Sequence, residues 1–118
     1  MRKGLMLIAL GGAILATSVA PASAQERPDW CDSQRRQNDT EATICDNRSL
    51  WDLEGSLNIA YRKAMRELSR SDQGDLKESQ QDWLSGTRNA CGSDVGCLRG
   101  AYRSRVDELQ NIARRGHF

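Results

Sequence analysis

Apolar residues in the middle of the chain recur at steps of three and four positions, which is the spacing of one face of an α-helix. The clearest run begins after Ser49. Polar and charged residues fill the positions between, so this pattern predicts an amphipathic helix over about residues 49–68. Its apolar stripe consists of Leu50, Leu53, Leu57, Tyr61, Ala64 and Leu68.

Two segments further along the chain show the same spacing. The spacing in residues 73–89 predicts a second helix, whose inner face is only partly apolar. Ser71 or Asp72 could cap the start of this helix. A third helix is expected after Asp94, which is suited to cap it, and should end at Gly116. No segment alternates apolar and polar residues as a strand would. The pattern therefore predicts an all-α fold, a small antiparallel bundle of about three helices.

The region before these helices is polar and has no long-range periodicity. We expect residues 25–37 to form an extended N-terminal segment tethered at Cys31. In residues 38–45 (NDTEATIC), Asn38, Asp39 and Thr40 stand where a helix cap is preferred, and Glu41 complements the dipole of the first turn. A short helical turn is predicted there, as the start of a helical domain that runs to residue 115.

The first residues are typical of a secretory signal peptide. A positive start precedes an apolar run over residues 5–20, and Ala22 and Ala24 are the small residues that signal peptidase accepts. The run is short for a membrane anchor of about 20 residues. We therefore expect residues 1–24 to be removed, which leaves no membrane anchor and changes the formal charge from +1 to −1. The predicted export indicates a periplasmic or secreted protein. Because its charge is near neutral, we expect it to bind no nucleic acid.

Four cysteines remain after the predicted cleavage: Cys31, Cys45, Cys91 and Cys97. An even number in an oxidising compartment favours two disulfides. Pairing of neighbours is preferred, although the sequence leaves the crossed pairings open. A zinc site is disfavoured because structural ligands usually pair two to four residues apart, and His117 stands alone near the C-terminus. We expect no metal and no cofactor.

The sequence also argues against catalysis. A hydrolase usually needs a nucleophile with a base, a pair of carboxylates or a metal. His117 is poorly placed for work as a general base, and the carboxylates fit solvated helix faces with partners four residues away, such as Lys63 and Glu67. The protein is therefore predicted to act by binding and not as an enzyme.

Two stretches, TEATICDNRSLWDLEGSLNIAYRKAM and QQDWLSGTRNACGSDVGCLRGAYRSRVDEL, resemble the N-terminal domain family of the lysozyme inhibitor LprI. The resemblance covers roughly residues 29–110 and implies a small, helical, disulfide-bonded envelope domain. Lysozyme inhibition is implied only for the namesake of the family. The matching positions are Cys31, Ile44, Cys45, Leu50, Leu53, Leu57, Tyr61, Gln80, Trp83, Leu84, Arg88, Cys91, Cys97, Leu98, Tyr102, Arg105 and Leu109.

The chain departs from the family pattern at two places. Glu54 replaces an Asp, which keeps the charge. Three residues separate Leu84 from Arg88 where the pattern has two, and one extra residue turns a helix by about 100°. A bulge near Gly86 could absorb this rotation.

Two binding functions follow from these features. In the first, the turn Gly92–Gly96, which includes Ser93 and Asp94 and is flanked by Arg88 and Arg99, plugs the cleft of a lysozyme or other peptidoglycan hydrolase. The alternative for this turn is a plain helix connection. In the second function, the protein is a structural or accessory envelope protein, and a partly exposed Trp51 contacts another protein.

The remaining aromatic and basic residues have simpler interpretations. We expect Trp83 in the core and Trp30 over a disulfide. For Arg88 and Arg105, a salt bridge between helices, with Glu54 or Asp52 as the partner, is favoured over a contact with a substrate.

Overall fold

The computed structural model describes residues 11–12, 26–33 and 37–118 of the chain. Within these ranges the protein is all-α and has no strand. The predicted leader, residues 1–24, lies outside the described residues except for Gly11 and Gly12. Among the helices of the described part, none is both long enough and apolar enough to cross a membrane.

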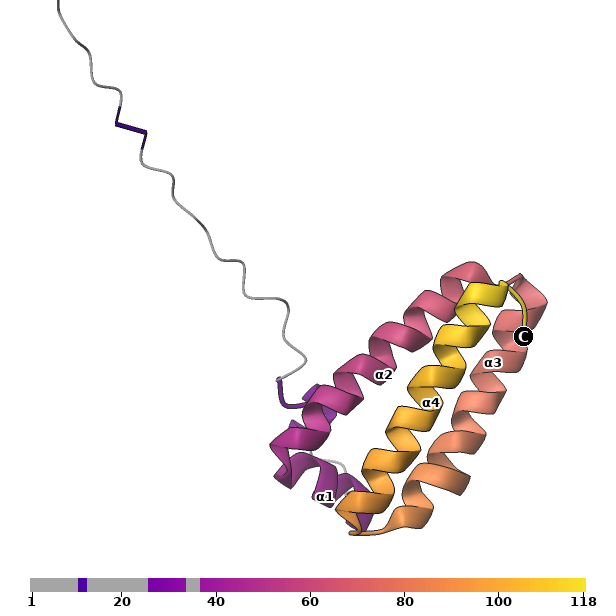
Figure 1. Ribbon diagram of the computed structural model, residues 1–118. Helices are drawn as coiled ribbons and strands as arrows, with labels where there is room; N and C mark the ends of the chain where they lie inside the picture. Colours follow the sequence, from indigo (N-terminus) through magenta and orange to yellow (C-terminus); the bar gives the residue numbers. More distant parts are fainter. Residues whose placement is uncertain (1–10, 13–25, 34–36) are drawn as a thin grey trace, which may run out of the picture.

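Three long helices form the body of the molecule, and Figure 1 shows them side by side. They are joined by short helical pieces. Helix α3 runs opposite to α2 and α4, whereas α2 and α4 run in the same direction. The elements are η1 (Asp29–Asp32), α1 (Asp39–Asp46), α2 (Arg48–Glu67), α3 (Arg70–Trp83), the π-helix η2 (Leu84–Arg88), the 3₁₀-helix η3 (Asn89–Cys91) and α4 (Val95–Arg115).

Polar side chains set the starts of the helices. Asn38 and Glu41 form a reciprocal capping box at α1, which confirms the short helix predicted there. The Ser69 hydroxyl accepts a hydrogen bond from the Asp72 backbone N–H, at 3.2 Å, so α3 begins earlier than the predicted residue 73. The prediction of Ser71 or Asp72 as the cap was wrong because Ser69, just after α2, already provides the acceptor. Asp94 caps α4 as expected.

The predicted apolar stripes meet in one core. Leu50, Leu57 and Ala64 of α2 are almost fully buried, and Trp83 is buried as predicted. The Trp83 ring meets the Tyr102 ring edge to face, with 5.4 Å between the centroids. The complete core consists of Ile44, Leu50, Leu57, Ala60, Ala64, Leu68, Leu76, Trp83, Leu98, Tyr102, Leu109 and Ile112.

Two disulfides complete the fold, Cys31–Cys45 and Cys91–Cys97. The neighbouring cysteines are therefore paired, and the crossed pairings are excluded. The first crosslink holds the N-terminal segment, including the short helix η1 in a region expected to be extended, against α1. The second crosslink joins the end of η3 to the first turn of α4.

The π-helix η2 absorbs the extra residue between Leu84 and Arg88. A π-turn accommodates one residue more than an α-helical turn of the same direction. At the end of α3, the Leu84 backbone N–H is shared between the carbonyl groups of Gln80 and Gln81. As a result, the Arg88 side chain is buried on the inner side of the bundle.

Candidate functional site

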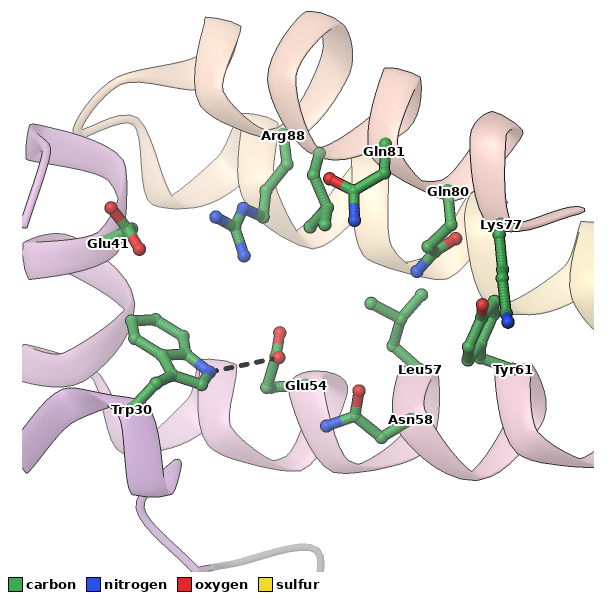
Figure 2. Close-up of a pocket in the computed structure, with 11 residues that line it drawn as sticks. Trp30, Glu41, Glu54, Leu57, Asn58, Tyr61, Lys77, Gln80, Gln81 and Arg88 are labelled. Carbon is green, nitrogen blue, oxygen red and sulfur yellow. Dashed lines mark hydrogen bonds between the residues drawn. The ribbon is translucent and has the colours of Figure 1, made fainter. Parts of the chain in front are cut away.

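An open cavity of about 590 Å³ lies between α2 and α3. Figure 2 shows its side chains: α2 forms one wall with Glu54, Asn58 and Tyr61, and α3 forms the opposite wall with Lys77 and the two glutamines Gln80 and Gln81. The N-terminal segment and η2 close one end with Trp30 and Arg88. Glu41 of α1 lies at the same end.

Two local features of the chain bring the end of the cavity together. Trp30 lies next to Cys31, so the disulfide to Cys45 fixes the segment that carries the indole against the bundle. Arg88 closes the π-helix and points into the cavity (Figure 2). Its guanidinium carbon lies 5.8 Å from the centroid of the Trp30 ring, within the range of a cation–π contact.

Arg88 is 7% exposed but forms no ion pair within the described parts of the chain. The predicted salt bridge to Glu54 or Asp52 is therefore not present there. The Nε atom donates to the Asn89 side chain at 3.2 Å, and the guanidinium also interacts with the Tyr102 side chain by charge and hydrogen bonding. Asp52 instead keeps one carboxylate oxygen buried without a hydrogen-bond partner among the described residues.

Glu54 is a buried acceptor at the floor of the cavity. The Tyr102 hydroxyl donates to one carboxylate oxygen at 2.5 Å, and the Trp30 indole donates to the other at 3.4 Å. The placement of Trp30 over a disulfide stays a prediction; the structure shows that its indole nitrogen points to this carboxylate. Burial raises the pKa of Tyr102 well above its usual value, and the charge and hydrogen bond of Glu54 raise it further, while nearby Arg88 acts in the opposite direction.

The charges that line the cavity cancel. Glu41 and Glu54 carry two negative charges, and Lys77 and Arg88 carry two positive charges. The remaining polar groups are uncharged amides and one phenol. The cavity is therefore polar and rich in donors and acceptors, and its described lining residues carry charges of both signs in equal number.

A second hollow of about 460 Å³ adjoins the first. Both are lined by Trp30, Glu54 and Asn58, so the indole stands between them. Trp51 lines the second hollow and is half-buried, as expected for it. Its indole nitrogen donates to the backbone carbonyls of Ile44 and Cys45 at 3.0 and 3.2 Å. We call the two adjoining hollows the α2 groove.

The crosslinked turn Gly92–Gly96 lies outside the α2 groove. Ser93, Asp94 and Gly96 are exposed, and the turn is held at both ends. The Asp94 carboxylate accepts from the Cys97 backbone N–H at 3.0 Å, and Gly92 adopts a positive φ of 58°, which favours glycine. The turn is therefore exposed, polar and fixed in conformation.

The predicted site residues divide between these two places. Arg99 is exposed near the turn and donates to the Ser49 hydroxyl at 3.1 Å, which anchors it to the start of α2. Arg88, predicted to flank the turn, points into the α2 groove, and Trp51 also lines the groove. The structure therefore brings together Gly92, Ser93, Asp94 and Arg99, and separates them from the other two.

Arg105 has a structural position. It is 3% exposed and donates to the side chains of Gln80 and Ser79 at 2.9 and 3.1 Å, which ties α4 to α3. It also forms an ion pair with Glu108 at 3.0 Å on its own helix. The favoured interpretation as a link between helices holds, but amide and hydroxyl oxygens of α3 replace the predicted carboxylates of α2.

The sequence interpretation missed the α2 groove. One signal was available: Glu54 lies four residues after Leu50 and three before Leu57, so a carboxylate occupies a core position of the apolar stripe. A charged residue at such a position needs buried partners. The identity of those partners, Tyr102 and Trp30, depends on elements distant in sequence.

Fold and crosslinks define a small, all-helical domain with two disulfides. In the described residues, no group of three or more metal-ligating side chains is present. The model of the family "Lysozyme inhibitor LprI" matches residues 31–115, and the chain belongs to this family. Comparisons with curated proteins and with solved structures give no match.

Proposed function

We propose that this protein binds a lysozyme or another peptidoglycan hydrolase outside the cytoplasm and blocks its cleft. The observation that supports this function best is membership of the lysozyme inhibitor family over residues 31–115. The family is one of inhibitors, so the protein acts by binding and not by catalysis. Its two disulfides fit an oxidising compartment such as the periplasm or the exterior.

The crosslinked turn Gly92–Gly96 is the proposed contact. Lysozymes cleave their substrate with two carboxylates in an open cleft, and a cation or N–H donor on a rigid loop can engage such groups. Arg99 supplies an exposed cation beside the turn. Because the Cys91–Cys97 disulfide fixes the turn before binding, little ordering entropy is lost in the complex.

Lysis of cell-wall substrate by c-type and g-type lysozymes, with the oxidised protein in excess, tests the proposed function. We expect inhibition of at least one lysozyme, and we expect Arg99→Ala to weaken it about tenfold, the loss typical of a charge-assisted contact. Arg115→Ala, an exposed change at the other end of α4, is the matched control and should leave the inhibition unchanged.

The outcomes separate the two binding functions. No inhibition at micromolar excess would favour the accessory envelope protein that partners another envelope protein. Inhibition that is equally strong in Arg99→Ala and in the parent would reject the turn as the contact while keeping the function.

A further inference from the structure

We infer that the α2 groove is a binding site for a neutral oligosaccharide. This inference is independent of the proposed function, because it concerns a different surface from the turn. Four observations on the groove lead to it: its size and division, its charge balance, its side-chain amides and its aromatic walls.

The size and division of the groove fit a short chain of rings. Small-molecule sites usually measure about 300–1,000 Å³, and each of the two hollows, at about 590 and 460 Å³, falls in this range. Trp30, Glu54 and Asn58 line both hollows, so one elongated ligand can occupy both and cross the indole. A pair of adjoining subsites is the arrangement that a linear chain of similar units requires.

The charge balance favours an uncharged ligand. In the larger hollow, Glu41 and Glu54 are accompanied by Lys77 and Arg88, and in the second hollow Glu26, Asp29 and Glu54 are accompanied by Arg62, so charges of both signs line the groove along its length. An anion would meet the carboxylates, and a cation would meet Arg88, which already covers the Trp30 ring at 5.8 Å. A neutral ligand with many hydroxyl groups has neither conflict and can use Lys77 and Arg88 as donors and Glu54 as an acceptor.

The polar groups of the groove keep bonding capacity for such a ligand. The guanidinium of the buried Arg88 points into the cavity (Figure 2). It has five N–H donors, and those that Asn89 and Tyr102 do not use stay available to a ligand. The side-chain amides of Asn58 and Gln81 are exposed at its walls, and neither bonds to another described residue. Each amide offers two donors and an acceptor, which suits the hydroxyl pairs of a sugar ring.

The aromatic side chains of the groove supply the apolar part of the recognition. Trp30 and Tyr61 are both half-buried and line the cavity, and because Arg88 lies over one face of the Trp30 ring, a sugar ring would use Tyr61 or the opposite face of the indole. The face of an aromatic ring carries partial negative charge, and the C–H groups on the flat side of a pyranose carry partial positive charge. A protein ligand would instead be expected to need a larger apolar patch, and the main exposed hydrophobic side chain near the groove is Ile59.

Titration of the oxidised protein with soluble oligosaccharides tests the inference, with calorimetry and tryptophan fluorescence as readouts. Chito-oligosaccharides and cello-oligosaccharides of two to four rings are the probes, because they share neutral pyranose chemistry and differ in the acetamido group. We expect saturable binding of at least one series, tighter for longer chains. Trp30→Phe should shift the fluorescence response.

Asn58→Ala and Gln81→Ala are the decisive variants, because both side chains are exposed and unbonded in the described structure, and their loss should not affect folding. Each should weaken the binding about 3- to 10-fold, the effect of one lost hydrogen bond. Gln110→Ala, an exposed amide on α4 away from the groove, is the matched control and should bind like the parent.

Absence of binding to both series at 10 mM would overturn the inference, and so would equal weakening by Gln110→Ala. If neither series binds but Asn58→Ala weakens the inhibition of a lysozyme, the groove is a protein-docking surface and the oligosaccharide inference is wrong. Sugar binding without lysozyme inhibition would support the inference and count against the proposed function.

Discussion

The Cys31–Cys45 disulfide is buried and holds one wall of the α2 groove, whereas the Cys91–Cys97 disulfide lies at an exposed turn. The first spans 14 residues and joins the N-terminal segment that carries Trp30 to α1. The second spans 6 residues and joins two helical elements that already pack on the core. Crosslinks of the same chemistry therefore serve different purposes: one places an aromatic side chain, and the other shapes a loop.

Removal of the first crosslink is expected to have the largest effect. On the chain-entropy model, a loop of this length contributes roughly 3 kcal/mol to the free energy of unfolding. The double variant Cys31→Ala with Cys45→Ala should lose about that amount in urea unfolding, and the Trp30 indole should leave Glu54. A smaller loss, with unchanged tryptophan fluorescence, would show that other contacts hold the segment in place.

Removal of the second crosslink should cost less. The shorter loop contributes roughly 2.4 kcal/mol on the same model, and the Asp94 cap remains. We expect the double variant Cys91→Ala with Cys97→Ala to keep the native fluorescence of Trp30 while the turn becomes more mobile. Amide hydrogen exchange at residues 92–96 measures the mobility, and protection equal to that of the parent would contradict the role assigned to the crosslink.

A substitution of Tyr102, which bonds to Glu54 at the floor of the groove, tests how much the buried side of the groove contributes to stability. Tyr102→Phe removes the donor to buried Glu54 and should lower the free energy of unfolding by about 1–3 kcal/mol, the cost of a buried acceptor that loses its partner. Tyr61→Phe, a half-buried phenol on the same cavity, is the control and should cost less. Urea unfolding at pH 7 measures both.

The raised pKa of Tyr102 also predicts that the free energy of unfolding depends on pH. Its pKa is raised in the folded state above the ordinary value of 10.0, so the folded protein keeps this proton where the unfolded chain loses it. The contribution of this proton to the free energy of unfolding is fully present below pH 10 and is lost as the pH rises above 10. The decline of stability above pH 10 should be less steep in Tyr102→Phe than in the parent, and parallel curves would contradict the assigned environment.

Much of the fold could be predicted from local patterns. The apolar stripe of α2, the Asp94 cap and the stop at Gly116 are encoded by residues close in sequence, so their spacing was sufficient. The start of α3 was misplaced because three polar residues, Ser69, Ser71 and Asp72, could each have capped it. Which one does so depends on where α2 ends.

The α2 groove could not be predicted in the same way. Its walls come from five elements, and their arrangement depends on a disulfide and a π-turn that place Trp30 and Arg88 at one end. An extra residue before Arg88 was visible in the sequence, but the direction in which the side chain would point was not. The π-turn sets the direction of the Arg88 side chain.

The sequence by itself determined the helices, the two neighbouring cysteine pairs as the favoured option and the resemblance to an inhibitor family, since each depends on short-range spacing. Only the tertiary structure decided which polar side chains share a cavity. Burying Glu54 and Arg88 is favourable only when distant groups stabilise them, and for Glu54 the Tyr102 hydroxyl does so across two helices. Such partners are fixed by packing in three dimensions, which residue spacing does not encode.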